Sequence, residues 1–198
     1  EYINDGIDKA ESKIHSLYED YFLRPTTLTL VTGTSKYDLP ETIYAHKIRK
    51  VIFRNGHDVY EIKRLRDKNK LLNYALNRAT TNTSPYYEYL LVNEVAGQPQ
   101  ILFTPDIKES GAFVEVWHIR NANRLELDTD VCDIPEFIRF VIQDVKVRCY
   151  DKEGHPHLGI AQQELAELEQ DMVSTLAGMI VDDDNEIEAD FSAYNEMN

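Results

Sequence analysis

Residues 31–40, VTGTSKYDLP, decide how this chain is read, because the hydrophobic period changes there. Immediately before them leucine and threonine alternate, which is the period-two pattern of a strand with one buried face. Gly33 permits a tight turn, and the alternation resumes until Pro40, which has no N–H to donate to a sheet. The stretch therefore predicts a β-hairpin with strands at residues 27–30 and 37–39.

The residues before this hairpin predict an amphipathic helix over residues 3–23. Asn4 or Asp5 is placed to cap its start, and Pro25 is placed to stop it. Its apolar residues recur at steps of three and four, which puts them on one helical face. They are Ile3, Ile7, Ala10, Ile14, Leu17, Tyr18, Tyr21 and Phe22.

The residues after the hairpin predict a β-rich segment. Asn-Gly in RNGHD, residues 54–58, is a strong hairpin signal. Helical spacing of apolar residues predicts one short helix over residues 67–78. Short apolar runs bounded by turn residues predict further strands. These lie at residues 47–53, 59–65, 86–92, 100–104 and 113–119.

The helical period returns near the C-terminus. Asp133 is the expected N-cap of a helix over residues 134–150, with Pro135 in its first turn. The segment DKEGHPH, residues 151–157, ends this helix, and a long helix over residues 158–179 follows. The short loop makes the two helices antiparallel neighbours. The first carries a wide apolar stripe of Phe137, Ile138, Val141, Ile142, Val145 and Cys149, and the second a narrow seam of Leu158, Ala161, Leu165, Leu168, Met172, Leu176 and Met179.

These patterns predict an α+β protein. Its three-helix bundle consists of the N-terminal helix and the C-terminal helical hairpin, and an antiparallel β-rich unit is inserted between them. The bundle is assigned residues 1–24 and 130–181, and the β-rich domain residues 25–129. Residues 182–198 are expected to form an acidic, extended C-terminal arm.

Charge and composition exclude several classes of protein. The formal net charge is −14, and residues 182–198 contain seven acids and no bases. This charge disfavours free binding to nucleic acid, although DNA can pass nearby without being held. No apolar run approaches the roughly 20 residues of a membrane span, and no signal peptide is visible. Because the sequence begins at Glu1 rather than methionine, we expect an upstream piece.

No motif of catalysis or cofactor binding is recognisable. There is no phosphate-binding loop, dinucleotide fingerprint or nucleophile elbow. Cys132 and Cys149 are expected to be reduced, and the position of Cys149 on an apolar stripe indicates packing. His155 and His157, with Asp151 and Glu153 nearby, lack a further ligand at a clear spacing. The acidic DDDNEIEAD lacks the glycine and closing glutamate of a calcium loop. We expect no enzyme, metal or cofactor.

Three segments together resemble the head-to-tail adaptor (connector) proteins of tailed bacteriophages, particularly the short-tailed type. The first is TLTLVTGTSKYDLPETI, residues 27–43, which resembles the family's strand, glycine turn and Tyr-x-Leu-Pro. The second is the basic hairpin VIFRNGHDVYEIKRL, residues 51–65. The third is DIPEFIRFVIQDVKVRCYDKEGHPHLG, residues 133–159, which resembles the family's Pro-Glu helix and glycine loop.

The resemblance implies a structural virion protein at the head-to-tail interface, assembled in the host cytoplasm. Such a protein forms a homo-oligomeric, dodecameric ring beneath the portal protein and extends the DNA channel. It also offers an attachment platform to tail nozzle or fibre proteins. DNA passes without sequence-specific binding, and no membrane is involved. The alternative is a cytoplasmic, non-enzymatic binding module whose β unit recognises a peptide or protein.

The arm contains three apolar residues in a charged segment: Ile187, Phe191 and Tyr194. Composition alone is typical of a solvated terminus. However, a segment that folds on a partner uses such residues as anchors. With the resemblance, we expect the arm to dock on the portal or on a neighbouring subunit.

Basic residues flank the predicted second hairpin. They are Lys47, Arg49, Lys50, Lys63, Arg64, Arg66, Lys68 and Lys70. Lysines at a sheet edge discourage unwanted strand pairing. They can equally complement an acidic surface of an adjacent subunit or the portal, where rim charges set encounter and register. Contact with DNA phosphates is a third reading.

Overall fold

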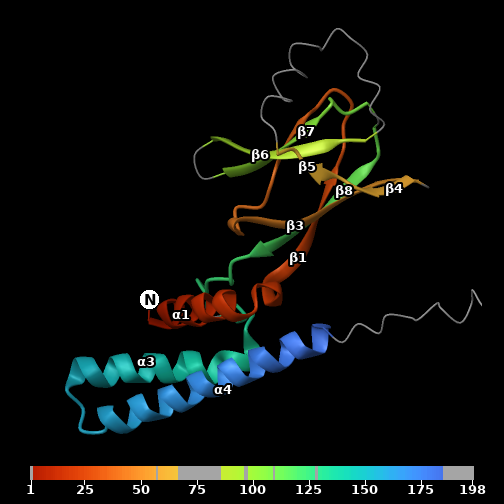
Figure 1. The fold of residues 1–198 in the computed structure, drawn as a ribbon. Coiled ribbons are helices and arrows are strands. Elements are labelled where there is room, and N and C mark those ends of the chain that lie inside the picture. The colour runs from red at the N-terminus through yellow and green to blue at the C-terminus, as the bar shows by residue number, and fades with distance from the viewer. Residues whose placement is uncertain are drawn as a thin grey trace, which may run out of the picture. The chain divides into compact units, whose positions relative to one another are not determined.

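The computed structural model describes residues 2–56, 58–66, 86–95, 98–108, 110–127 and 129–184. The predicted helix at residues 67–78 and the arm residues after 184 lie outside these ranges. The chain divides into two compact units (Figure 1). One, here called the β unit, is Phe22–Asn121; the other, the helical unit, combines Glu1–Tyr21 with Ala122–Asn198.

The β unit consists of two four-stranded sheets, and the protein is therefore of the predicted α+β class. Sheet A has the order β1-β8-β3-β4, with every neighbouring pair antiparallel. Its strands are β1 (Leu23–Thr29), β8 (Phe113–Arg120), β3 (Ile43–Asn55) and β4 (Asp58–Glu61). Sheet B has the order β2-β7-β6-β5. Its strands are β2 (Lys36–Asp38), β7 (Gln98–Thr104), β6 (Glu88–Val95) and β5 (Lys63–Arg64). The β5–β6 pair is parallel, which departs from the purely antiparallel unit that the sequence predicts.

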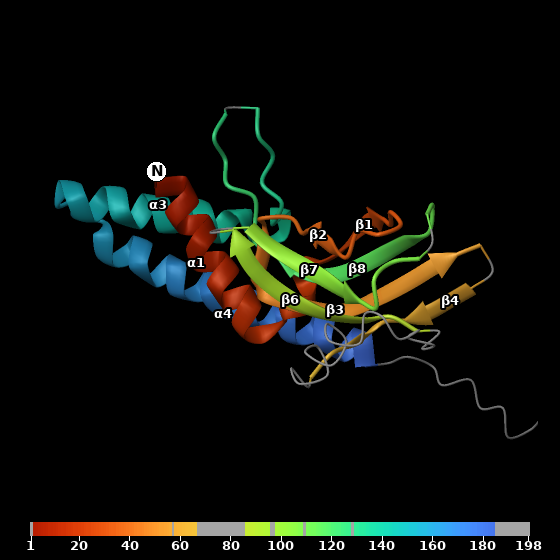
Figure 2. The ribbon, with the colours of Figure 1, turned by 90° about the horizontal axis from the view of Figure 1, so that it is seen from above.

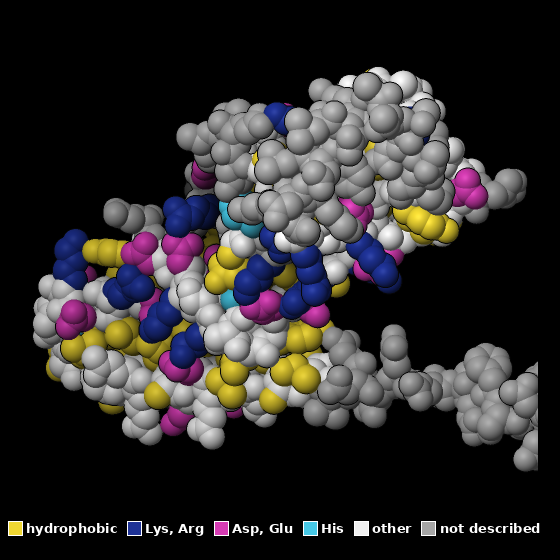
Figure 3. All heavy atoms as spheres, turned by 45° about the horizontal axis from the view of Figure 1, so that its top comes forward, with side chains coloured by type: hydrophobic (Ala, Val, Ile, Leu, Met, Phe, Trp, Pro, Cys, Tyr) yellow, Lys and Arg dark blue, Asp and Glu magenta, His cyan; other side chains and the backbone are white. Residues whose placement is uncertain are grey.

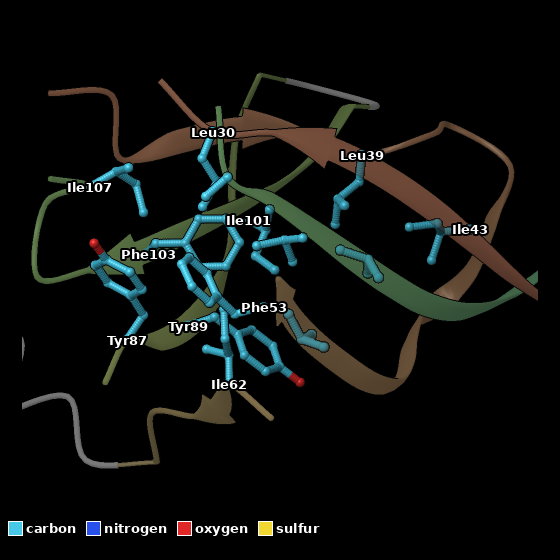
Figure 4. Close-up of a cluster of buried hydrophobic side chains, with 14 residues drawn as sticks. Leu30, Leu39, Ile43, Phe53, Ile62, Tyr87, Tyr89, Ile101, Phe103 and Ile107 are labelled. Atoms are coloured by element: carbon cyan, nitrogen blue, oxygen red, sulfur yellow. The ribbon is translucent and has the colours of Figure 1, made fainter. Parts of the chain in front are cut away.

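The predicted hairpin across Gly33 is wrong, because its two strands belong to different sheets. β1 pairs with β8, whereas β2 pairs with β7. The N–H of Leu30 donates to the Ala112 carbonyl at 2.8 Å, and that of Gly33 to the Ile107 carbonyl at 2.9 Å. Gly33 has a φ of 80°, which suits glycine. Leu30 and Leu39 are both buried in the core of this unit, and a change of sheet is what places both there (Figure 4).

The Tyr37 hydroxyl closes this corner. It accepts the N–H of Val31 at 2.8 Å and lies 3.2 Å from the Thr34 carbonyl oxygen. The Tyr37 ring packs on Phe103, with 5.7 Å between the ring centroids. Tyr37, which the sequence presented only as one residue of an alternating strand, therefore also connects the two sides of the turn through its hydroxyl.

The core of the β unit is one cluster of buried side chains contributed by both sheets (Figure 4). Alternation along β3 and β8 sends Val51, Phe53, Val114 and Val116 into it. Sheet B contributes Tyr89, Ile101 and Phe103. The remaining members are Leu30, Leu39, Ile43, Ile62, Tyr87, Ile107 and Ala112.

Two other strand predictions change in the structure. The predicted strand at residues 59–65 is two strands, because the chain leaves sheet A at the buried Ile62 and enters sheet B as β5. Pro25, predicted as a helix stop, lies within β1. β1 is at the edge of sheet A, where a missing N–H is tolerated. The RNGHD hairpin is confirmed: β3 and β4 pair around Gly56, whose φ is 58°.

The helical unit contains three long helices that contact one another. They are α1 (Tyr2–Leu17), α3 (Ile138–Glu153) and α4 (Leu158–Asp184), with short 3₁₀ helices η1 (Glu19–Phe22) and η2 (Pro135–Phe137) beside them. Within the described residues, no helix combines the length and apolarity that crossing a membrane requires. Helix α4 continues to Asp184, so the predicted arm start at residue 182 falls inside a helix.

Helix boundaries differ from the predictions at two places, where Tyr21 and Asp133 make contacts outside a helix. Helix α1 ends at Leu17, and η1 then turns Tyr21 towards Phe137, with ring centroids 5.9 Å apart. Asp133 is not the N-cap; Ile134 occupies that position before η2. The Asp133 carboxylate instead accepts the N–H of Asn123, at 3.1 Å from Oδ2. The predicted loop after α3 is confirmed, with Gly154 as a left-handed C-cap.

Packing between the helices follows most of the predicted apolar positions. Ala161, Leu165, Met172 and Leu176 of the α4 seam are buried. The α3 stripe is wrong at Ile142, which is 60% exposed. The next two residues, Gln143 and Asp144, are buried although they are polar. Helix α3 therefore packs on its neighbours through polar as well as apolar side chains.

Candidate interaction surfaces

The histidines and cysteines that were weighed as metal or catalytic residues can now be placed. Within the described residues, no group of three or more His, Cys, Asp or Glu side chains is placed to hold a metal ion. The His155 ring stacks on Tyr150, with centroids 4.2 Å apart, and its Nδ1 accepts the His157 N–H at 3.2 Å. Cys132 and Cys149 are free and half-buried.

We give the name basic strip to four of the predicted basic residues: Lys50, Lys63, Arg64 and Arg66. All four are exposed, and none forms an ion pair with another described residue. The N–H of Ile62 donates to the Val51 carbonyl at 2.8 Å, which brings Lys50 close to Lys63. Lys50 lies on β3, Lys63 and Arg64 form β5, and Arg66 follows β5.

The other predicted basic residues lie differently. Lys47 is half-buried, with its Nζ 5.1 Å from the centroid of the Tyr44 ring. Arg49 is exposed on β3. Lys68 and Lys70 lie outside the described residues.

An irregular segment of β3 leads into the basic strip. Ile43 lies opposite Arg120 and Ile48 lies opposite His118, so β3 contains extra residues between these pairs. Ala45 and His46, within this bulge, have positive φ values of 47° and 56°. Such backbone is costly for residues other than glycine, and the sequence contained no signal for it.

Charge is divided unequally between the two units. The β unit contains 14 Lys and Arg residues against 10 Asp and Glu, whereas the rest of the chain contains 7 against 25. The negative charge of the protein therefore belongs to the helical unit, and the β unit by itself is basic. Figure 3 shows dark-blue Lys and Arg side chains on both units, with magenta Asp and Glu side chains among them.

Most cations of the helical unit are already paired with carboxylates. The pairs are Lys9–Asp144, Lys13–Glu169, Arg124–Asp8, Lys146–Glu164, Arg148–Asp5 and Arg148–Asp144. Four of these pairs join α1 to α3 or α4, or α3 to α4, whereas Arg124–Asp8 joins the loop at residues 122–133 to α1 and Arg148–Asp144 lies within α3. Positive charge that remains available to a partner is thus found chiefly on the β unit.

A loop at residues 122–133 projects from the helical unit, and Figure 2 shows it as a narrow excursion between β8 and η2. The Asn4 side chain bonds both backbone groups of Leu125, at 2.9 and 3.0 Å. The Asp130 carboxylate accepts the N–H groups of Glu126 and Leu127, at 2.7 and 2.8 Å. These two hydrogen bonds hold the pKa of Asp130 below its ordinary value.

The tip of this loop exposes apolar side chains. Leu127 is 68% exposed and Val131 is 81% exposed. No pattern in the sequence pointed to them, because neither lies at a helical or strand spacing. The signal that could have indicated a structured loop is the presence of Asp130 and Asp133, because aspartate side chains commonly accept backbone N–H groups in turns.

The outer face of sheet A is a mixed apolar and charged surface. Trp117 lies opposite Pro25 and Lys50, and Ile52 lies opposite Glu115. Both Trp117 and Ile52 are half-buried. At the end of this face Phe113 is partly exposed, and the guanidinium of Arg54 donates to Glu115 at 2.9 Å.

Comparison with known families supplies the identity. The family model described as SU10 adaptor protein matches residues 1–190. This chain belongs to the SU10 adaptor protein family. No curated protein matches it. The resemblance to phage head-to-tail adaptors that the sequence predicted is therefore confirmed.

Membership in the SU10 adaptor family sets the general function. The family is a phage head-to-tail adaptor family, so the chain is a structural component of a virion. Family membership implies interaction with portal and tail components.

The arm residues Ile187, Phe191 and Tyr194 lie outside the described residues. Their docking remains a prediction.

Proposed function

We propose that this SU10 adaptor forms a homo-oligomeric, dodecameric ring beneath the portal, extends the DNA channel and provides the platform on which tail proteins attach. The observation that carries the proposal is the family match over residues 1–190. Exposed apolar side chains on the long helices support it. Ile142 of α3 and Ile160 of α4 are both exposed, and packing against neighbouring copies would cover them.

The two parts of the chain have different tasks in this proposal. Residues 1–24 and 130–181 act as a three-helix bundle that packs side by side with its copies. Residues 25–129 form the β-rich domain that meets tail nozzle or fibre proteins. DNA passes through the ring without sequence-specific binding, consistent with the net charge of −14.

The C-terminal arm, the part of residues 182–198 that follows α4, fastens the ring to the portal or to a neighbouring subunit. Ile187, Phe191 and Tyr194 are its anchors. Truncating a buried aromatic anchor typically costs about 2 kcal/mol or more, so the double variant Phe191→Ala/Tyr194→Ala should bind portal much more weakly. Docking that is unchanged in this variant would reject the arm's role.

The basic residues complete the contacts. Lys47, Arg49, Lys50, Lys63, Arg64, Arg66 and Lys68 face acidic surfaces on an adjacent subunit or the portal. Because such charges act over long range and are screened by salt, assembly should slow as ionic strength rises.

A mixing experiment tests the function as a whole. The purified chain is added in excess to purified portal rings, and native mass spectrometry counts the copies on each portal. We expect a closed set of copies on the portal, and electron microscopy should show a new ring at its tail-facing end. A portal that never gains mass would refute the proposal.

A further inference from the structure

The loop at residues 122–133 is built to present apolar side chains. Leu127 and Val131 are 68% and 81% exposed. Asp130 and Asn4 bind the loop backbone through their side chains. The backbone at residues 125–127 is therefore held in place before the loop meets a partner. Fixing a loop in advance reduces the entropy that binding costs, which is how preorganised contacts gain affinity.

Two carboxylates belong to the same turn as Leu127. Glu126 is exposed beside Leu127, and the carboxylate of Asp130 lies at the base of the tip. Arg124, the cation of this loop, is already paired with Asp8 at 2.6 Å. A surface that receives this loop must therefore combine an apolar area with positive charge.

The outer face of sheet A has this combination. Trp117 and Ile52 supply partly exposed apolar area, and Lys50 stands directly opposite Trp117 in the ladder. Lys50 belongs to the basic strip, whose four cations have no ion-pair partner among the described residues. Tryptophan is also among the residue types enriched at the energetic centres of protein interfaces.

We propose that the loop of one copy docks on the outer face of sheet A of the next copy in the ring. Leu127 and Val131 pack on Trp117 and Ile52, and Glu126 approaches Lys50. The contact joins two different surfaces of the same chain, so it is head-to-tail. Repetition of a head-to-tail contact closes a ring when the rotation allows. This inference rests on the proposed ring and names a further contact between neighbouring copies, in addition to the packing of their helical bundles.

Copy counting on portal rings tests the contact. In Leu127→Asp/Val131→Asp the tip becomes polar, and the protein concentration that fills the portal should rise by about tenfold or more. Asp130→Ala keeps both apolar side chains but removes the acceptor that shapes the loop. It should shift the filling concentration in the same direction by a smaller factor. Unchanged filling by the double variant would overturn the proposal.

Charge exchange tests the register of the contact. Glu126→Lys and Lys50→Glu should each impair filling, and the two changes combined in one chain should restore it, because every copy carries both surfaces. A combined variant as poor as the product of the single variants would show that these two groups do not face each other.

Photo-crosslinking identifies the recipient. A benzoylphenylalanine placed at Leu127 should form adducts with peptides that contain residues 50–54 or 113–117 of a second copy. Adducts with the portal, or with the helical unit of a second copy, would overturn the assignment.

Controls separate this inference from the ring itself. Val31→Asp changes a residue that is 52% exposed on a different corner and should fill portals like the wild type. Each variant must elute and unfold as the wild-type chain does before portal is added. If the wild type itself never fills a portal, the proposed function fails; if the wild type and the Leu127→Asp/Val131→Asp variant fill equally, only the loop contact fails.

Discussion

The Nζ of Lys9 on α1 lies 2.7 Å from Oδ1 of Asp144 on α3, and the Nε of Arg148 lies 2.7 Å from Oδ2 of the same carboxylate. The Asp144 side chain is only 4% exposed. Burial by itself raises the pKa of Asp144, but the hydrogen bonds from Lys9 and Arg148 outweigh it and hold that pKa below its ordinary 3.8. The carboxylate is therefore a charged link between the two helices.

Replacing this carboxylate should destabilise the helical unit. In Asp144→Asn the amide keeps the shape but cannot pair with two cations. Losing one member of a buried pair costs several kcal/mol, and the partly exposed cations reduce this to about 1–3 kcal/mol. Urea unfolding followed by circular dichroism measures the change. The matched control, Asp8→Asn, removes the exposed pair with Arg124 and should cost less than about 1 kcal/mol.

The same carboxylate predicts a pH dependence. Because its pKa is lower in the folded state than its ordinary 3.8, its contribution to stability is complete above that pH and is lost as the pH falls through the folded value. The difference in unfolding free energy between wild type and Asp144→Asn should stay constant from neutral pH down to about pH 4 and shrink below it. Buried His118, whose pKa is lowered by burial, affects both proteins alike and cancels in the difference. A gap that stays constant below pH 3 would contradict this assignment.

Close approach of α1 and α3 at Gly6 gives a packing prediction. A Cβ at Gly6 would lie 3.1 Å from Val141 Cγ1 and 3.3 Å from the Val141 carbonyl oxygen. Gly6→Leu should therefore force the helices apart and destabilise the protein by roughly 1–3 kcal/mol. In Gly178→Ala, on α4, the new Cβ meets no atom within 4 Å, so helix propensity should stabilise the protein by about 0.5–1 kcal/mol. Thermal unfolding compares the two, and equal shifts would show that α1 and α3 are not in close contact.

The sequence predicted elements better than their pairing. Hydrophobic periodicity and turn-forming residues located the α4 seam, the RNGHD hairpin and the glycine that caps α3, because each of these features depends on neighbouring residues. The sheet partner of β1 is decided by residues far along the chain, in β8. An alternating pattern indicates which face of a strand is buried but not which strand pairs with it. The hairpin at Gly33 was therefore predicted from neighbouring residues alone, and the distant strands β8 and β7 are the actual partners.

Candidate surfaces were predictable only in part. The basic residues were visible as a charge pattern, but the ladder bond from Ile62 to Val51 is what brings Lys50 close to Lys63. Leu127 and Val131 could not be singled out, since an exposed apolar residue is ordinary until its loop is seen to be fixed. The burial of Asp144 could not be predicted either, because a single acidic residue in a helical pattern is usually solvent-exposed.

Tyr37 provides the sharpest test of the corner between the two sheets. Its hydroxyl accepts the Val31 N–H at 2.8 Å, and Tyr37→Phe removes that acceptor while the ring keeps its contact with Phe103. Because Val31 is exposed and water can replace the bond, the cost should be about 0.5–1.5 kcal/mol, with faster hydrogen exchange at the Val31 amide. Tyr2→Phe is the matched control, because the Tyr2 hydroxyl makes a long, exposed hydrogen bond of 3.4 Å with Lys152 Nζ. This variant should change the free energy of unfolding by less than about 0.5 kcal/mol. If the Val31 amide exchanges equally fast in wild type and Tyr37→Phe, the corner is not held by this hydroxyl, and the burial of Leu30 and Leu39 alone directs the chain from one sheet to the other.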